Sequence, residues 1–245
     1  MFTRLVLSAA LSLAPVGIAN AAPNDDLAPR ASQALTFLET GLSQDIPDPH
    51  NGLGYTGNRT KLFGTPWKDM DHNQCDTRND ILARDLTNVD FSPRPGVQTR
   101  EQGIGQGVRK CKNATVYSGT LEDPYTGQTI QFDRAKNASK VQIDHVIPLG
   151  YAYRHGAWKL AQEGKKKLLE EFANDPINLV AVEQRANIVK SDKGPAEWMP
   201  DNTSYRCEYA VRMSEVLQKY NSVGFTLGDQ DKKSLIHTLQ TECGL

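Results

Sequence analysis

Residues 141–149 read VQIDHVIPL, an apolar run typical of a strand, and the run presents Asp144 and His145 side by side. Further along, residues 175–200 read DPINLVAVEQRANIVKSDKGPAEWMP. The Asp-Pro pair that opens this second stretch breaks a helix, so the apolar letters after it predict a second short strand. The letters that follow predict a helix that ends at Ser-Asp-Lys-Gly-Pro. The order strand, connection, strand, helix makes the predicted fold class α+β.

The remaining elements are predicted from helical periodicity, capping residues and turn residues. Asp76 is suited to cap a helix in DTRNDILARDL, and the sequence DPYTG at 123–127 predicts the turn of a hairpin. The other expected elements are strands at 115–121, 128–132 and 177–182, and helices at 34–42, 150–158, 159–173, 183–190, 205–219 and 230–242.

The N-terminus has the composition of a secretory signal peptide. Its only charge is Arg4, residues 5–18 are apolar, and Ala19-Asn20-Ala21 provides small residues for cleavage. The apolar stretch is shorter than the roughly 18 residues of a membrane anchor, so secretion without a membrane span is expected. The predicted organisation is a signal peptide at 1–21, a variable lead-in at 22–54 and one domain at 55–245.

Four cysteines remain after the signal peptide: Cys75, Cys111, Cys207 and Cys243. An even number of cysteines in an exported chain predicts two disulfides, and the absence of a Cys-x-x-Cys pair makes zinc binding the weaker interpretation. The sequence allows three pairings. We favour Cys75–Cys111 and Cys207–Cys243, because the second bond would join the two C-terminal helices and the first would close the region before the strand at 141–149.

Positive charge is concentrated around the Asp-His pair. The formal net charge is only −1, and it becomes −2 without Arg4, whereas proteins that hold nucleic acid as cargo are usually strongly basic. Residues 134–167 nevertheless contain eight Lys or Arg against Asp144 and Glu163. A solvated helix face would explain the three lysines at 165–167 taken alone. Together with the motif, a surface that binds the phosphates of a nucleic acid is the better interpretation.

The motif residues suit hydrolysis of a phosphodiester. Asp144 and Asn187 offer the oxygen ligands that a hard cation prefers, and an ordinary imidazole such as that of His145 titrates near 6.5, which suits a general base. Lys190 lies one helical turn after Asn187 and is expected to hold a phosphate oxygen. Neighbouring side chains of a regular strand point to opposite faces, so we expect an irregularity at the strand end, near Pro148.

These residues resemble the HNH, or ββα-metal, endonucleases, particularly a secreted group related to the C-terminal domain of GmrSD-type restriction enzymes. The resemblance implies that His145 is the general base, that Asp144 and Asn187 hold one divalent ion, and that Asn178 braces the loop between the strands. Asn in place of the family's last His implies Mg²⁺, with Mn²⁺ as an alternative. The resemblance extends over LFGTPWKDMDHNQCDTRNDILARDL, DPYTG and SYRCEYAVRM, roughly residues 55–243.

Two arginines and one acidic loop have open roles. Arg78 and Arg84 either face the phosphate or pair with neighbouring aspartates. Residues 69–80 imitate a calcium loop, with acidic or amide residues at its first, third, fifth and twelfth places. Gln74 stands where that loop needs Gly, so calcium binding is the less favoured interpretation.

The sequence therefore predicts a secreted, monomeric, metal-dependent endonuclease that cuts DNA, and as an alternative RNA, largely without sequence preference and leaves 5′-phosphate ends. Two other functions remain open. One is a disulfide-stabilised nucleic-acid-binding protein without turnover, which the intact Asp144, His145 and Asn187 disfavour. The other is an antibacterial nuclease toxin, for which the chain has no recognisable delivery module.

Overall fold

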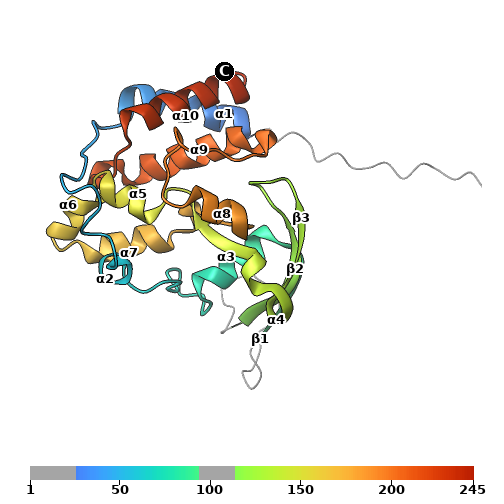
Figure 1. Cartoon of the computed structure of the whole chain (residues 1–245). Helices are drawn as coiled ribbons and strands as arrows, with labels where there is room; N and C mark the ends of the chain where they lie inside the picture. Colours follow the sequence, from blue (N-terminus) through green and yellow to red (C-terminus); the bar gives the residue numbers. More distant parts are fainter. Residues whose placement is uncertain (1–25, 94–113) are drawn as a thin grey trace, which may run out of the picture.

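The computed structural model describes residues 26–93 and 114–245 (Figure 1). The predicted signal peptide and Cys111 lie outside the described residues. Two small antiparallel sheets are packed among helices, in agreement with the predicted mixture of helices and strands. Within the described residues, no helix is both long enough and apolar enough to cross a bilayer.

The first sheet has three strands. β2 (Ala114–Glu122) and β3 (Thr129–Asp133) form the predicted hairpin, with Glu122 opposite Thr129. The turn is closed by Asp123, whose Oδ2 accepts a hydrogen bond from the Thr126 N–H at 2.8 Å. β1 (Thr87–Pro93) pairs with the other edge of β2 and was not predicted from the sequence.

The second sheet contains the motif strands. β4 (Val141–His145) pairs antiparallel with β5 (Leu179–Glu183), and α8 (Gln184–Lys190) follows directly. Glu183 caps α8, because its Oε2 accepts a hydrogen bond from the Ala186 N–H at 2.8 Å. The predicted order of strand, connection, strand and helix is therefore observed. The apolar run at 141–149 is strand only as far as His145.

The connection between β4 and β5 differs from the prediction of two helices. It contains α5 (Leu149–Arg154), α6 (Ala157–Gln162) and α7 (Lys166–Asn174), and then η3 (Pro176–Asn178), a single 3₁₀ turn. Gly156, with φ +102°, and Gly164, with φ +72°, separate the helices. At Gly156 a Cβ atom would lie 1.8 Å from the carbonyl oxygen of Gly224, so only glycine fits this crossing.

A group of helices distant in sequence packs together to form the main core. α1 (Leu27–Thr36) continues into the π-helical turn η1 (Phe37–Gly41), so the helix expected at 34–42 begins earlier. α1 lies beside α9 (Thr203–Tyr220) and α10 (Asp229–Glu242) (Figure 1). Arg30 of α1 forms ion pairs with Glu208 and Glu215 of α9. The segment predicted as a lead-in thus shares the core of the chain, with Leu38 fully buried.

A smaller core lies between the two sheets. α3 (Thr77–Asp85) begins at the predicted cap, where an Asp76 oxygen accepts a hydrogen bond from the Asn79 N–H at 2.8 Å. The apolar side of α3 meets residues of β2, β3, β4 and β5. The remaining short elements are α2 (Arg59–Phe63), α4 (Arg134–Asn137), η2 (Ala138–Lys140) and η4 (Asn221–Val223).

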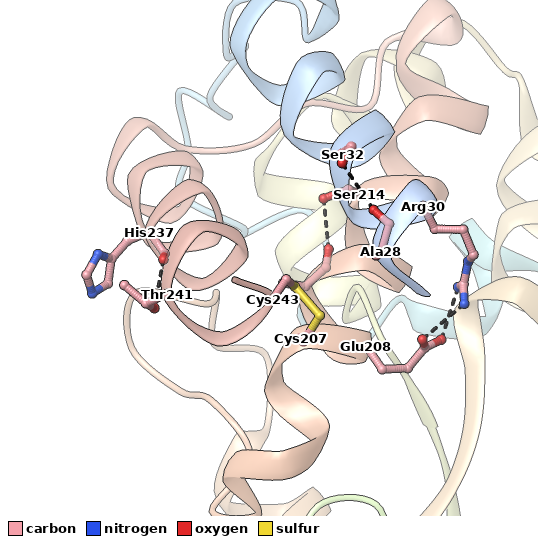
Figure 2. The surroundings of a disulfide bond; sticks show 10 residues. Ala28, Arg30, Ser32, Cys207, Glu208, Ser214, His237, Thr241 and Cys243 are labelled. Carbon is pink, nitrogen blue, oxygen red and sulfur yellow. Dashed lines mark hydrogen bonds and ion pairs between the residues drawn. A yellow bond between two sulfur atoms is a disulfide. The ribbon is translucent and has the colours of Figure 1, made fainter. Parts of the chain in front are cut away.

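The predicted Cys207–Cys243 disulfide is confirmed. It joins the end of α10 to α9 across a sequence separation of 36 residues (Figure 2). Figure 2 also shows Arg30 of α1 reaching Glu208, one residue beyond Cys207. The second predicted bond includes Cys111, outside the described residues, so the prediction of two disulfides is not confirmed.

Removal of this disulfide should destabilise the protein. A cross-link that closes a loop of this length stabilises the folded state by about 4 kcal/mol, mainly by restricting the unfolded chain. We expect the double variant Cys207→Ser/Cys243→Ser to melt about 10 °C below the wild type, and to lose any activity at the temperature at which it unfolds. Thermal unfolding followed by circular dichroism measures the shift. An unchanged melting temperature would contradict the prediction.

Candidate functional site

Asp144, His145 and Asn187 of the motif meet at one hollow of about 510 Å³. Its walls come from the end of β4, the start of α5, the exposed side of α8 with the residues after it, and the start of α2 with the segment before it. The lining residues include Tyr55, Arg59, Asp144, His145, Gly150, Asn187, Ser191 and Asp192. We call this hollow the cleft. β4 ends at His145, three residues before Pro148, and Asp144 and His145 both border the cleft although they are neighbours in the sequence.

Asp144 is a buried carboxylate with one bonded oxygen and one available oxygen. Its Oδ2 accepts a hydrogen bond from the Tyr125 hydroxyl at 2.6 Å and lies 2.8 Å from Lys190 Nζ. No donor among the described residues bonds to Oδ1. In the described part of the chain, every fully buried side-chain oxygen or nitrogen has a hydrogen-bond partner. Because Oδ1 has none, it is not fully buried, and it borders the cleft that Asp144 lines. The carboxylate is therefore fixed from behind and presents Oδ1 to the cleft.

Lys190 is placed differently from the prediction. Its side chain is 0% exposed, and its ammonium group contacts Asp144 and donates a hydrogen bond to the carbonyl oxygen of His145 at 2.7 Å. Burial lowers the pKa of Lys190, while the neighbouring carboxylate opposes that shift. The ammonium group thus contacts groups inside the protein, and this buried position does not fit the predicted contact with a phosphate oxygen. Lys190 instead positions Asp144 and the end of β4.

Asn187 has a similar division of its two polar atoms. Its Nδ2 donates a hydrogen bond to Gln142 Oε1 at 2.8 Å, which fixes the orientation of the amide. Asn187 Oδ1 receives no hydrogen bond from the described residues and, by the same reasoning as for Asp144, is not buried. Asp144 and Asn187 therefore each present one oxygen at the same cleft.

His145 is held as a neutral ring of defined tautomer. Its Nε2 lies 2.8 Å from the carbonyl oxygen of Ala173, and because a carbonyl oxygen only accepts, Nε2 carries the proton. The other nitrogen, Nδ1, keeps its lone pair. Burial lowers the pKa of His145 to about 4, with Arg59 and Lys190 acting in the same direction and Asp144 opposing them. The ring is therefore a weaker base than the sequence suggested, but it is unprotonated at neutral pH.

Asn178 organises the turn that follows β4. It is fully buried, its Oδ1 accepts a hydrogen bond from the Ile147 N–H at 2.8 Å, and its Nδ2 donates to the Ile147 carbonyl oxygen at 3.3 Å. The Asn178 carbonyl oxygen accepts a further bond from the Val146 N–H at 2.8 Å. These contacts are those that a bracing role requires, since they continue the β4–β5 pairing past His145.

The two arginines that the sequence left open both support the backbone. Arg84 pairs with Asp85 at 2.6 Å and donates to the carbonyl oxygens of Pro176 and Leu179, and Arg78 donates to the carbonyl oxygen of Val141 at 3.2 Å. Neither lines the cleft, so the phosphate role fits neither.

Arg59 is the cation that sequence reasoning missed. It is exposed, lines the cleft together with His145, and forms no hydrogen bond or ion pair with any described residue. Its neighbourhood in the sequence, Asn58-Arg59-Thr60, gives no sign of this role, because the site residues follow only much later in the chain. The contact with the site is visible only after folding.

The acidic loop at 69–80 is organised by its own hydrogen bonds. Asp69 and Asp71 accept bonds from the Asn73 N–H, each at 3.1 Å, and Asn73 donates to Asp80 at 2.9 Å. Burial, with the nearby acidic residues acting in the same direction, raises the pKa of Asp80 to about 6. Across residues 26–93 and 114–245, no group of three or more His, Cys, Asp or Glu is arranged to hold a metal ion.

Burial of His145 predicts that this residue makes the metal-free fold less stable in acid. The unfolded chain takes up a proton on this ring near pH 6.5, whereas the folded chain does so only near pH 4. Between these values the unfolded state binds more protons at this group, so the contribution of His145 to stability falls as pH falls, by about 3 kcal/mol at pH 4. The raised pKa of Asp80 acts in the opposite direction, so the contribution of His145 is measured as a difference between wild type and His145→Gln, by urea unfolding with chelator at pH 7, 5.5 and 4. The wild type should lose about 3 kcal/mol relative to His145→Gln between pH 7 and pH 4, and should lose nothing relative to His237→Gln, at an exposed position. A constant difference between wild type and His145→Gln would contradict the prediction.

Comparison with known proteins agrees with the resemblance to GmrSD-type proteins. Residues 76–226, more than half of the chain, match the family described as "GmrSD restriction endonucleases, C-terminal domain". A protein of Arthroderma benhamiae described as "Uncharacterized secreted protein" is 31% identical over 240 residues, which cover 96% of each chain. No solved structure matches the chain. The matched range contains Asp144, His145 and Asn187, and the chain therefore belongs to the family of GmrSD restriction endonuclease C-terminal domains.

Proposed function

We propose that this protein is a secreted endonuclease of the HNH type that hydrolyses phosphodiester bonds in DNA, with RNA as a second substrate. One observation carries the proposal. Asp144 and Asn187 each present, at the cleft that His145 also lines, an oxygen to which no described residue donates a hydrogen bond, and the His145 ring keeps a lone pair on Nδ1. The description of the family as restriction endonucleases and of the relative as secreted supports the proposal.

The two oxygens fit a hard divalent cation. One carboxylate and one amide oxygen form the type of donor set that Mg²⁺ uses, with water and substrate phosphate as its other ligands. Asp144 and Asn187 would hold the ion, and Mn²⁺ is the alternative. A bound ion would neutralise charge on the phosphate and assist the departing oxygen. This assignment needs only two protein ligands, so it does not require a cluster of three acidic or imidazole groups.

The residues of the chain have distinct roles in the proposed reaction. His145 Nδ1 takes a proton from the attacking water, and the Ala173 carbonyl oxygen keeps the other ring nitrogen protonated so that Nδ1 stays available. Tyr125 and Lys190 fix Asp144, since both contact its Oδ2. The strands β4 and β5 with α8 would form the ββα unit of this enzyme class. The low net charge favours weak binding without sequence preference.

Cleavage of plasmid DNA by residues 22–245 tests the function. Supercoiled plasmid is incubated with the protein in Mg²⁺, in Mn²⁺ and in excess chelator, and end-labelling identifies 5′-phosphates. We expect nicking that requires the metal. A folded protein that binds DNA and cuts neither DNA nor RNA would instead establish the alternative, a binding protein without turnover.

Asn187 variants test the metal site separately from cleavage. Asn187→Leu removes the neutral oxygen ligand, so we expect at least about 10-fold weaker Mn²⁺ binding by calorimetry and a matching loss of activity at limiting metal. Asn187→Asp keeps an oxygen at this position and should retain binding. If Asn187→Leu binds Mn²⁺ like the wild type, the ligand assignment is wrong.

A further inference from the structure

A second, smaller hollow of about 190 Å³ also borders His145. It is lined by residues of α2 and the loop after it, Arg59, Thr60, Phe63, Gly64, Pro66 and Trp67, and by His145, Leu149 and Ala173. Most of its wall belongs to residues 59–67, which precede the range that matches the family. The matched family range therefore leaves out most of the wall of this hollow.

The wall of the small hollow suits a flat, apolar ring. Phe63 is buried and Trp67 is partly exposed, and together with Pro66 and Leu149 they give the hollow an aromatic and apolar character. Arg59 is its one cationic side chain. Its volume is below the roughly 300–1,000 Å³ of pockets for drug-sized ligands, which favours a single ring system. Aromatic side chains stack on nucleobases of any sequence, because each base has a π-face.

The position of Trp67 is fixed by an unusual backbone conformation. Its φ is +57°, which is rare for a bulky residue, and its carbonyl oxygen accepts a hydrogen bond from the Thr77 N–H at 3.3 Å. Part of the indole packs against the small core formed by α3 and the sheets. The remaining surface lines the hollow. An aromatic ring held in this way needs little ordering when a base stacks on it.

The small hollow and the cleft share three residues, Arg59, His145 and Leu149. A nucleic-acid strand whose phosphate lies at His145 in the cleft therefore has an adjacent nucleoside within reach of the small hollow. Arg59 is exposed and lines both spaces, where its guanidinium group can neutralise the phosphate that connects them. A base stacked within a duplex cannot enter such a hollow without unpairing, which costs a few kcal/mol.

We propose that this hollow is a nucleoside subsite, in which an unpaired base next to the cleaved phosphate packs against Trp67, and that the protein therefore prefers single-stranded to double-stranded nucleic acid. This inference deepens the proposed function and rests on it. It assigns substrate selection to a segment outside the matched family range, whereas the cleft performs the chemistry.

Trp67 variants test the subsite. Trp67→Leu keeps an apolar side chain but removes the flat π-face, and Trp67→Phe keeps an aromatic ring. Trp158→Leu is the matched control, since Trp158 lies on α6 and lines neither hollow. Cleavage of a single-stranded oligonucleotide and of its duplex is measured with Mg²⁺, and binding of each is measured by fluorescence anisotropy in chelator. Melting temperatures establish that each variant is folded.

We expect the wild type to prefer the single strand, in both kcat/KM and affinity. Trp67→Leu should lower the single-strand values about 5- to 150-fold, mainly through KM, with much less effect on the duplex. Trp67→Phe should recover much of the loss. Equal losses on single strand and duplex, or none, would overturn the subsite. Absence of cleavage by the wild type would contradict the proposed nuclease, whereas the binding measurements would still decide the subsite.

Discussion

Replacement of His145 by Ala should lower the rate of metal-dependent DNA cleavage by about 10²- to 10⁴-fold, the usual contribution of a general base. The structure explains why no other side chain takes over. His145 is the one imidazole that lines the cleft within the described residues, and its Nε2 bond to the Ala173 carbonyl oxygen leaves Nδ1 as the proton acceptor. The effect should appear in kcat, because substrate binding does not depend on this proton transfer.

The control for this variant must separate chemistry from packing. His145 is only 7% exposed, so Ala also leaves a cavity, and His145→Gln is the better match in volume. His237→Ala, on the exposed side of α10, provides the same substitution away from the site. Both His145 variants should show this decrease in rate at temperatures where they are folded, and His237→Ala should cleave at the wild-type rate. Wild-type turnover by folded His145→Gln would rule out His145 as the base.

Replacement of Lys190 by Met should destabilise the protein by about 3–5 kcal/mol, because it leaves the Asp144 carboxylate buried without its counter-charge. Lys190 is 0% exposed and the Asp144 side chain 7% exposed, so solvent is kept from Lys190 Nζ and reaches the carboxylate only from the cleft. In a domain of this size the loss corresponds to a decrease of about 10 °C in melting temperature. Urea unfolding gives the free-energy difference, and calorimetry gives the shift in temperature.

A double variant separates the ion pair from the rest of the packing. Asp144→Asn/Lys190→Met removes both charges, so it should recover most of the stability lost in Lys190→Met. Lys193→Met is the matched control, because among the described residues the Lys193 side chain bonds only to the Val189 carbonyl oxygen, at 2.8 Å and in an exposed position. If Lys190→Met is as stable as Lys193→Met, the buried pair does not hold the site together.

Local sequence patterns determined much of the fold. The cap at Asp76, the turn at 123–127 and the succession of β4, β5 and α8 follow from interactions between residues close in the chain, and all are observed. β1 was missed because its pairing with β2 is decided by the partner strand. The first break in the β4–β5 connection was predicted after residue 158 and lies at Gly156, because its position depends on the approach of Gly224, which is distant in sequence. The second break, at Gly164, was missed.

The identities of the central site residues could also be predicted. Asp144, His145 and Asn187 occur on elements whose order alone brings them together, since β4 and β5 are paired and α8 follows β5 directly. The bracing contacts of Asn178 have the same origin. Asp144, His145 and Asn187 therefore lie at the same cleft as a consequence of strand pairing.

Only the tertiary structure decided where the basic side chains point and which groups they contact. Lys190 lies one turn after Asn187, yet its side chain points inward to Asp144. Arg84 donates hydrogen bonds to the carbonyl oxygens of Pro176 and Leu179. Long basic side chains reach several partners, and only the packed structure selects among them. Arg59 and Trp67 come to line the small hollow beside His145 through the folding of a separate segment. The sequence by itself thus determined which residues form the candidate site, and the tertiary structure decided which charges face the cleft, because burial and long-range packing are properties of the whole chain.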